Sequence, residues 1–483
     1  MSVPGSKETG PGWRALWRVA VLAVSAGADH QAAAETVTPV NLAEEAALAC
    51  DNRAPDAGTG WGATFASNVA EVVFAPVGTD RYFGLTCVSI DGTVTSGNAP
   101  TGMIAWSESV SSSARQGTAI RIDRLSGGVY ATGVTNAFGI LAWSDTTFAT
   151  NPAAVTIGKC DGTVSANVAP GGLAVAFCAR TAVEVALGSG ALLFGGTYGW
   201  DAGDGSATNA AAVLQALLAK VKARTASPAE SNALAAASSA GYAILGGSAG
   251  DTVRYGPNVT VYGKIALGDG YDTVSLSGLA SGARVTLPPV TGAELLAVTN
   301  SPDVTVSNAT VYADLFVGSN TLCRLKDSAY TFAGLYGRGT LVPQGTLSVT
   351  NRIEVGGFGE APVGARLAVT GGLTLGAGVT CALRAAVTDG LWTNDTVSVS
   401  GVLTVAGSGA VDLRCTPEAP LAAHTKRIVM SAAGGIVNPG WLGGWSLVGT
   451  GRDEEKGLIR TVRAEGNNIV AIMSVGGTLI TIF

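Results

Sequence analysis

The sequence predicts an all-β protein, a right-handed parallel β-helix (β-solenoid) with an inserted α-helical hairpin, and three observations support this class. Self-similar segments recur at loose periods of about 20 to 35 residues in three stretches of the chain, as in solenoid proteins. Glycine is abundant, with 67 of 483 residues, whereas only 13% of the residues are charged and 6% are aromatic. The apolar residues are mainly Ala, Val and Leu, which suit a long, narrow core lined by short strands.

Residues 1–34 have the pattern of a secretory signal peptide. Arg14 and Arg18 precede an apolar run at residues 19–28, and small-residue cleavage motifs follow. The run is too short to span a bilayer, and no later stretch has the roughly twenty apolar residues of a transmembrane helix. We therefore expect a secreted or cell-surface protein that associates with the outer membrane or cell surface without a transmembrane segment. The seven cysteines share no motif spacing, and several are expected to be small core residues.

The first predicted β-solenoid block covers residues 35–200. The segment DGTVTSGNAPTGMIAWS at residue 91 is followed by GGVYATGVTNAFGILAWS at 127 and DGTVSANVAPGGLAVAFCA at 161. Each unit contains three short strands separated by turn residues, as expected for one triangular turn of a β-helix. We favour an internal ladder for the aligned tryptophans over an external sugar-stacking strip. The aligned positions are Val94, Val129 and Val164, spaced 35 and 35, and Trp106, Trp143 and Phe177, spaced 37 and 34.

A helical hairpin is predicted at residues 206–241, where the β pattern is interrupted. Ser227 is a suitable N-cap, a proline follows at the first helical position, and Glu230 completes a capping box. We expect the hairpin to dock on the side of the β body or to cap the end of the first block, in preference to contacting another subunit. Its apolar stripe consists of Val213, Leu214, Leu217, Leu218 and Val221.

A second β-solenoid block is predicted at residues 242–415, followed by a C-terminal β cap at 416–483. In this block Asp251 and Asp272 are equivalent positions 21 residues apart. The segments LSVTNRIEVG at 347, LAVTGGLTLG at 367 and VSVSGVLTVA at 397 align at offsets of 20 and then 30. The offset of 30 continues to Leu383 and Leu413, and the extra length fits a side loop around TDGLWTND.

The segment LGDGYDTVSLSG, residues 267–278, suggests a calcium loop. Asp251, Asp269 and Asp272 would supply carboxylate oxygens from successive turns, which suits a hard cation. The spacing of 21 departs from the turn of about 18 residues of calcium-binding β-rolls, and only two copies exist. The favoured interpretation is therefore a structural corner, in which glycine adopts a positive φ and aspartate bonds to backbone.

The pair GDTVRYGPNVTVYGKIALGDGYDTVSLSG resembles the passenger regions of bacterial autotransporters and related adhesin-like surface proteins. The resemblance covers residues 246–278 and is only architectural over 345–415. It implies a β-helix on a cell surface that binds glycans or surface proteins of a host or neighbouring cell. The sequence departs from a conventional autotransporter because the repeats run to about residue 415 and leave too little chain for a translocator barrel.

The expected function is therefore that of an adhesin-like structural or interaction protein without catalysis. A net charge of −6 and the lack of a basic run argue against nucleic-acid binding. A polysaccharide lyase or glycoside hydrolase is the alternative, but the carboxylates are scattered and only two histidines occur. A calcium-stabilised secreted repeat protein is a further alternative. The candidate contact residues for a glycan or partner are Trp392, Trp441 and Trp445, in glycine-rich segments.

Overall fold

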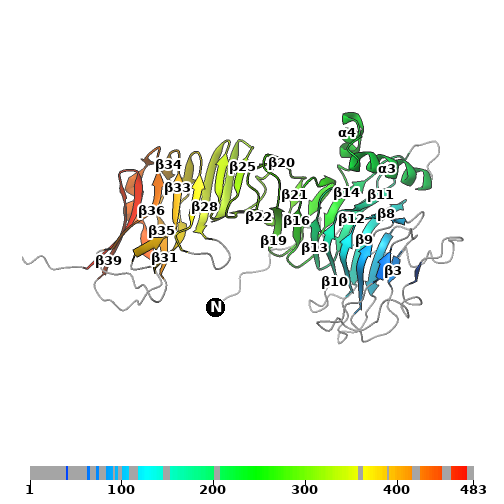
Figure 1. Cartoon of the computed structure of the whole chain (residues 1–483), viewed down its shortest axis with the longest axis horizontal. Coiled ribbons are helices and arrows are strands. Elements are labelled where there is room, and N and C mark those ends of the chain that lie inside the picture. The colour runs from blue at the N-terminus through cyan, green and yellow to red at the C-terminus, as the bar shows by residue number, and fades with distance from the viewer. Residues whose placement is uncertain are drawn as a thin grey trace, which may run out of the picture. The chain divides into compact units, whose positions relative to one another are not determined.

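The computed structural model consists mostly of strands in parallel sheets, with few helices (Figure 1). It describes residues 118–144, 153–200, 207–356, 363–388, 391–415, 425–448 and 458–475, together with short strands before them. The predicted signal peptide at residues 1–34 and both histidines lie outside the described residues. The early strands are β1 (Val40–Asn41), β2 (Ala63–Phe65), β3 (Val72–Phe74), β4 (Phe83–Ile90), β5 (Thr93–Thr95) and β6 (Thr101–Ser107).

The chain forms two compact units: unit 1 contains residues 1–272 and 288–292, and unit 2 contains residues 273–287 and 293–483. In unit 1 the chain visits three parallel sheets in rotation, and one such passage is called a turn below. Successive turns pair strand on strand, so that β7, β10 and β13 are neighbours in one sheet. The strands are β7 (Thr118–Leu125), β8 (Gly128–Gly133), β9 (Asn136–Ser144), β10 (Ala153–Cys160), β11 (Thr163–Val168), β12 (Leu173–Ala179), β13 (Ala182–Leu187), β14 (Leu192–Gly196), β15 (Tyr242–Leu245), β16 (Thr252–Tyr255), β17 (Thr260–Tyr262), β18 (Lys264–Ala266) and β21 (Val290–Thr291).

The register of unit 1 confirms the valine alignment and corrects the aromatic one. Val94 pairs with Val129, and Val129 pairs with Val164; all three are fully buried. Trp106 pairs with Trp143 in the backbone register. Phe177 instead pairs with Ile140, three residues before Trp143, so it does not continue the tryptophan column. The correct offset between β9 and β12 is 37 residues, because the turn before β12 is longer than the sequence alignment allowed.

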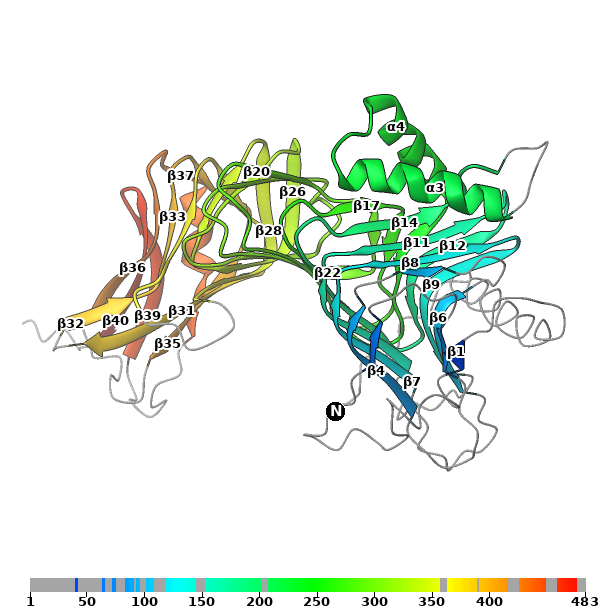
Figure 2. The ribbon, with the colours of Figure 1, turned by 45° about the vertical axis from the view of Figure 1, so that its right-hand side comes forward.

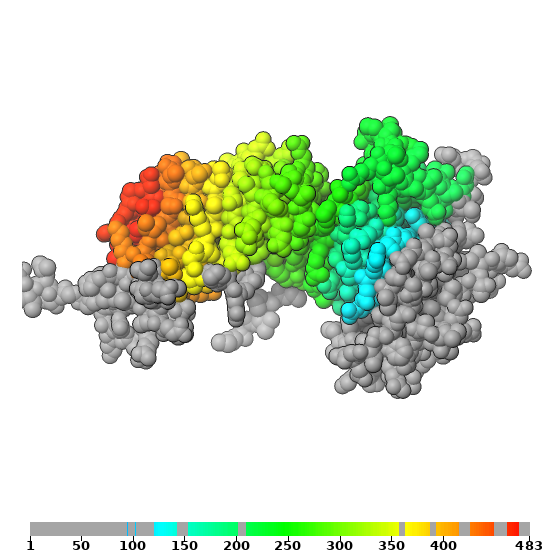
Figure 3. Space-filling model, viewed as in Figure 1, coloured from blue at the N-terminus to red at the C-terminus, as the bar shows by residue number. Residues whose placement is uncertain are grey.

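Two helices, α3 (Ala207–Lys222) and α4 (Pro228–Ala237), are inserted between β14 and β15. Ser227 caps α4 with the predicted capping box to Glu230. Figures 2 and 3 show the helices on the outside of unit 1, with α3 lying across the sheet that contains β8, β11 and β14. Their arrangement as a hairpin stays a prediction. The helices bury an apolar cluster of Leu192, Phe194, Leu214, Leu217, Leu218 and Leu234, with Tyr130, Val221 and Tyr262 packed against it.

The predicted division of the β body at the helices is wrong. β12 pairs with β15 and β13 pairs with β16, so the sheets of unit 1 continue past the inserted helices. The helices therefore pack on the side of unit 1, and the boundary between the two compact units lies at residues 272–293 of the chain. Of the predicted stripe, Val213 is 43% exposed, whereas Leu214, Leu217 and Leu218 are buried.

Unit 2 contains two sheets, called sheet D and sheet E. Sheet D has the order β20-β23-β25-β27-β29-β33-β36-β40-β39, and sheet E contains the other strands of the unit. Sheet D consists of β20 (Ala283–Thr286), β23 (Val304–Ser307), β25 (Leu322–Leu325), β27 (Thr340–Pro343), β29 (Arg366–Val369), β33 (Thr396–Val399), β36 (Thr425–Ala432), β40 (Asn468–Val475) and β39 (Leu458–Glu465). Sheet E consists of β19 (Asp272–Ser277), β22 (Ala293–Thr299), β24 (Asp314–Val317), β26 (Ala329–Gly337), β28 (Thr346–Val355), β30 (Leu373–Leu375), β31 (Val379–Thr388), β32 (Leu391–Asn394), β34 (Leu403–Val405), β35 (Gly409–Cys415), β37 (Ile436–Val437) and β38 (Ser446–Val448).

The predicted offset of 30 residues is confirmed in unit 2, and the offset of 20 is wrong. Leu367 pairs with Val397, and Leu383 pairs with Leu413. Val349 pairs with Leu375, at an offset of 26, because the segment from 347 belongs to sheet E whereas the segment from 367 begins in sheet D. The extra length of the 30-residue turn forms an antiparallel hairpin of β31 and β32.

The C-terminal part of unit 2 changes from parallel to antiparallel pairing. β36 pairs antiparallel with β40, and β40 pairs antiparallel with β39, which forms the edge of sheet D. A short 3-10 helix, η2 (Pro439–Gly444), precedes β38. These elements lie within the predicted cap at 416–483. Among the described residues, no helix has the length and apolar character needed to cross a membrane.

Candidate functional site

Buried side-chain oxygens at two kinds of corner, together called the corner ladder, accept backbone N–H groups from the preceding turn. In unit 1, Asp251 Oδ1 accepts the N–H of Val183 at 2.5 Å, and Asp272 Oδ1 accepts the N–H of Asp251 at 2.6 Å. In unit 2, at a different corner that follows β22, Ser301 Oγ accepts the N–H of Leu279 at 3.2 Å. Asp251, Asp272 and Ser301 are fully buried. Because buried N–H groups need acceptors, these side chains join successive turns close to the ends of their strands.

Asp251 has the densest set of hydrogen bonds in the unit 1 part of this ladder. Its Oδ2 accepts the N–H groups of Gly247 at 3.2 Å and Gly268 at 3.3 Å, in addition to the bond from Val183 to Oδ1. Burial raises the pKa of Asp251 to about 6. The three N–H groups favour the charged form and lower the pKa, but their effect is smaller than that of burial. No ion pair to Asp251 occurs among the described residues.

The three aspartates of the suggested calcium site do not converge. Asp251 and Asp272 are buried, whereas Asp269 is exposed at the corner. Both oxygens of Asp251 are occupied by N–H donors, which a cation would have to displace. In the described part of the chain, no group of three or more His, Cys, Asp or Glu side chains is placed to hold a metal. The geometry therefore gives Asp251 and Asp272 a structural role in the corner, and calcium binding stays a prediction.

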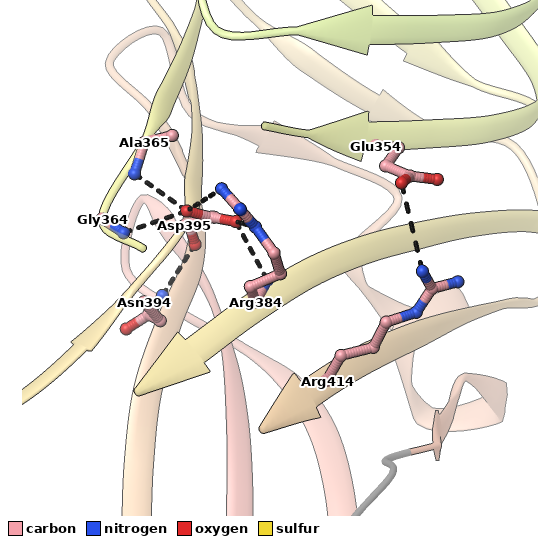
Figure 4. Close-up of polar contacts among 7 residues, drawn as sticks. All are labelled: Glu354, Gly364, Ala365, Arg384, Asn394, Asp395 and Arg414. Atoms are coloured by element: carbon pink, nitrogen blue, oxygen red, sulfur yellow. Dashed lines mark hydrogen bonds and ion pairs between the residues drawn. The ribbon is translucent and has the colours of Figure 1, made fainter. Parts of the chain in front are cut away.

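Asp395 is a buried carboxylate at a corner of unit 2. The sequence places it in a side loop and predicts no partner for it. It lies in the turn after the β31–β32 hairpin, is fully buried, and its Oδ1 accepts the N–H groups of Gly364 at 3.0 Å and Ala365 at 2.8 Å (Figure 4). Its Oδ2 accepts the Arg384 backbone N–H at 3.1 Å and Nε at 2.8 Å. Gly356 has a φ of 99° and leaves room for this guanidinium, since a Cβ there would collide with it.

The outer face of sheet E carries a row of charged side chains beside this pair. Glu354 is 4.0 Å from Arg414 (Figure 4). Glu354 is also 2.9 Å from Arg352, and Arg414 is 3.0 Å from Asp412. Glu354 and Asp412 occupy one column of the register, with Ala382 between them. Each carboxylate of this row therefore has an arginine partner on its own strand.

An aromatic column continues the same face toward β24. Phe316 pairs with Tyr336, and Tyr336 pairs with Glu354, so the three side chains stand on neighbouring strands. Phe316 and Tyr336 are partly exposed. Burial raises the pKa of Tyr336, with a further increase from the charge of Asp314 and an opposing effect from Arg352. This face of β24, β26 and β28 is the best candidate for ligand contact, because it combines partly exposed rings with polar groups.

The candidate tryptophans have different positions. Trp445 is 5% exposed, and its indole N–H donates to the Gly407 carbonyl at 2.9 Å, so it is a core residue and cannot serve as a contact residue. Trp441, in η2, is 54% exposed and remains available for contact. Trp392 lies in β32 opposite Val387, and its side chain is outside the described part of the structure.

The four described cysteines that can be assessed are free and buried in the core, as predicted for several of them. Burial raises the pKa of Cys160 and Cys323 to about 12, and it also raises the pKa values of Cys178 and Cys381. At neutral pH these thiols are therefore protonated, which makes them poor nucleophiles.

Comparison with protein-family models, with curated proteins and with solved structures finds no match to this chain.

Proposed function

We propose that the protein is an exported, adhesin-like interaction protein, in which a rigid right-handed parallel β-helix presents contact residues and performs no catalysis. The right-handed assignment is supported by the physics of parallel strands, whose crossover connections are right-handed in almost all proteins. Export is supported by the signal-peptide pattern at residues 1–34. The partners would be glycans or proteins on the surface of a host or neighbouring cell.

The observation that carries the non-catalytic proposal is the pairing of the carboxylates on sheet E. A glycoside hydrolase needs one carboxyl group to donate a proton and a second to act as base or nucleophile. Glu354 and Asp412 are each ion-paired with an arginine on the same strand, and the Asp395 carboxylate accepts five backbone or guanidinium N–H groups. In these contacts each of the three carboxylates accepts hydrogen bonds or ion pairs, whereas a general acid has to donate a proton to the leaving group.

A polysaccharide lyase or hydrolase is the second candidate, because Arg414 stands between Glu354 and Asp412 on one exposed face. A calcium-stabilised repeat protein is the third, supported only by the motif around Asp269.

A screen of the exported chain separates these functions. The protein is incubated with neutral and uronate polysaccharides, and new reducing ends and the absorbance of unsaturated uronate are followed over a day. We expect binding to a glycan or cell surface without turnover. Turnover by the wild type that is lost in Glu354→Gln would establish the enzyme instead. A rise in the unfolding temperature with millimolar calcium that is absent in Asp269→Asn would favour the calcium alternative.

A further inference from the structure

Two tyrosines of the chain lie across glycines in the same way. In β8 a Cβ at Gly128 would collide with the ring of Tyr130, and in β26 a Cβ at Gly334 would collide with the ring of Tyr336. In each case the glycine stands two residues before the tyrosine on one strand, and the ring occupies the space above the glycine. Such a ring protects the glycine backbone and presents its other face outward.

The two rings differ in what packs on them. Tyr130 belongs to unit 1 and packs against the apolar cluster of α3 and α4, and burial raises its pKa. Tyr336 belongs to unit 2 and is partly exposed in a column with Phe316. The structure thus covers Tyr130 with its own helices, whereas Tyr336 stays partly exposed.

Polar groups surround the accessible ring. Asp314 lies at the far side of Gly334, where a Cβ would approach its carboxylate oxygen at 2.6 Å, and Arg352 follows Gly334 in the same register column. Glu354 follows Tyr336 in the aromatic column. Two carboxylates and one guanidinium therefore border two aromatic rings, with a formal local charge of −1.

We infer that the outer face formed by Phe316, Tyr336, Asp314, Arg352 and Glu354 binds a neutral, hexose-containing glycan. The apolar C–H face of a sugar ring stacks on an aromatic ring, while its hydroxyl groups exchange hydrogen bonds with carboxylates and guanidinium. The local negative charge disfavours a polyuronate. This inference names the ligand of the contact surface in the proposed function and rests on that proposal.

The full mature chain is tested on an array of neutral and uronate oligosaccharides, followed by calorimetric titration of the bound compounds. We expect a neutral hexose oligosaccharide to bind and Tyr336→Ala to weaken that binding about tenfold or more, as for other central aromatic contacts. Tyr336→Phe, which keeps the ring, should change the affinity only a few-fold. The matched control is Tyr271→Ala, at an exposed tyrosine of unit 1, and should leave the affinity unchanged.

Circular dichroism checks that each variant is folded, and Phe316→Ala and Glu354→Gln test the same face if Tyr336→Ala does not fold. Binding of no glycan, a preference for uronate oligosaccharides, or equal affinities of the wild type and Tyr336→Ala would each overturn the inference. If Tyr336→Ala still binds the glycan as tightly as the wild type, the adhesin function is supported, but the glycan binds at another site. Turnover of a glycan whose binding needs Tyr336 supports the site and refutes the non-catalytic function.

Discussion

Asp251 in unit 1 and Asp395 in unit 2 each directly precede a strand, although of different sheets, and they have different electrostatic surroundings. Each accepts N–H groups from the preceding turn, and each is fully buried. Among the residues that the structure describes, backbone N–H groups alone bind the Asp251 carboxylate, whereas Asp395 also has the guanidinium of Arg384 at 2.8 Å.

The comparison shows two ways to keep a carboxylate inside a narrow β core. Backbone N–H groups satisfy the oxygens of Asp251 but do not offset the full cost of burying its charge, which is why its pKa rises to about 6. In unit 2 the hairpin of β31 and β32 returns the chain so that Arg384 and Asp395 meet at its base. Removing one partner should therefore have different consequences in the two units.

The largest effect is expected for Asp395→Ala. The substitution leaves Arg384 without its counter-charge and removes the acceptor of the N–H groups of Gly364 and Ala365. Breaking a buried ion pair in this way costs about 3–5 kcal/mol. Urea unfolding followed by circular dichroism should show this loss in the transition that includes unit 2. A loss below about 1 kcal/mol would mean that the pair is no more important than a surface salt bridge.

A smaller effect, of about 3 kcal/mol, is expected from pH at Asp251. Its folded-state pKa of about 6 is above the value of about 3.9 for an unfolded chain. The folded state therefore holds the proton more tightly, and the resulting stabilisation is full below about pH 4 and is lost as the pH rises through about 6.

Urea unfolding of the wild type and Asp251→Asn between pH 4 and 7 measures this contribution, because the other titrating groups cancel in the difference. The wild type should gain stability relative to the variant as the pH falls. Parallel profiles of the two proteins would show that Asp251 titrates alike in the folded and unfolded states.

Gly356→Ala should lower the free energy of unfolding by about 1–3 kcal/mol, because it disturbs the ion pair of Arg384 and Asp395. The residue has a φ of 99°, which L side chains rarely adopt, and the new Cβ would collide with the Arg384 guanidinium. In an Asp395→Ala background the arginine is free to move, so the two substitutions should cost less together than the sum of their separate effects. Additive effects in this double-mutant cycle would separate the glycine from the ion pair.

The periodicity of the sequence was sufficient to predict the stacked positions but not the contacts that depend on a change of direction. The spacing of 35 between valines and of 21 between Asp251 and Asp272 follows from one residue meeting its equivalent one turn later, and both pairings are found. Asp395 was missed because its partners come from a hairpin and from residues 30 or 31 positions earlier. Trp445 was misplaced because its glycine-rich surroundings resemble a loop, whereas the glycine at 409 leaves space for the indole.

The smallest effect is expected for Asp412→Ala on the outer face of sheet E. Its carboxylate bonds Arg414 at 3.0 Å, but both side chains are partly exposed, and such pairs contribute less than about 1 kcal/mol. Urea unfolding should therefore distinguish Asp412→Ala clearly from Asp395→Ala, although each removes a carboxylate paired with an arginine. A loss comparable to that of Asp395→Ala would mean that the row of Arg352, Glu354, Asp412 and Arg414 acts as one coupled network, and the difference between the units would then lie in the whole charged face.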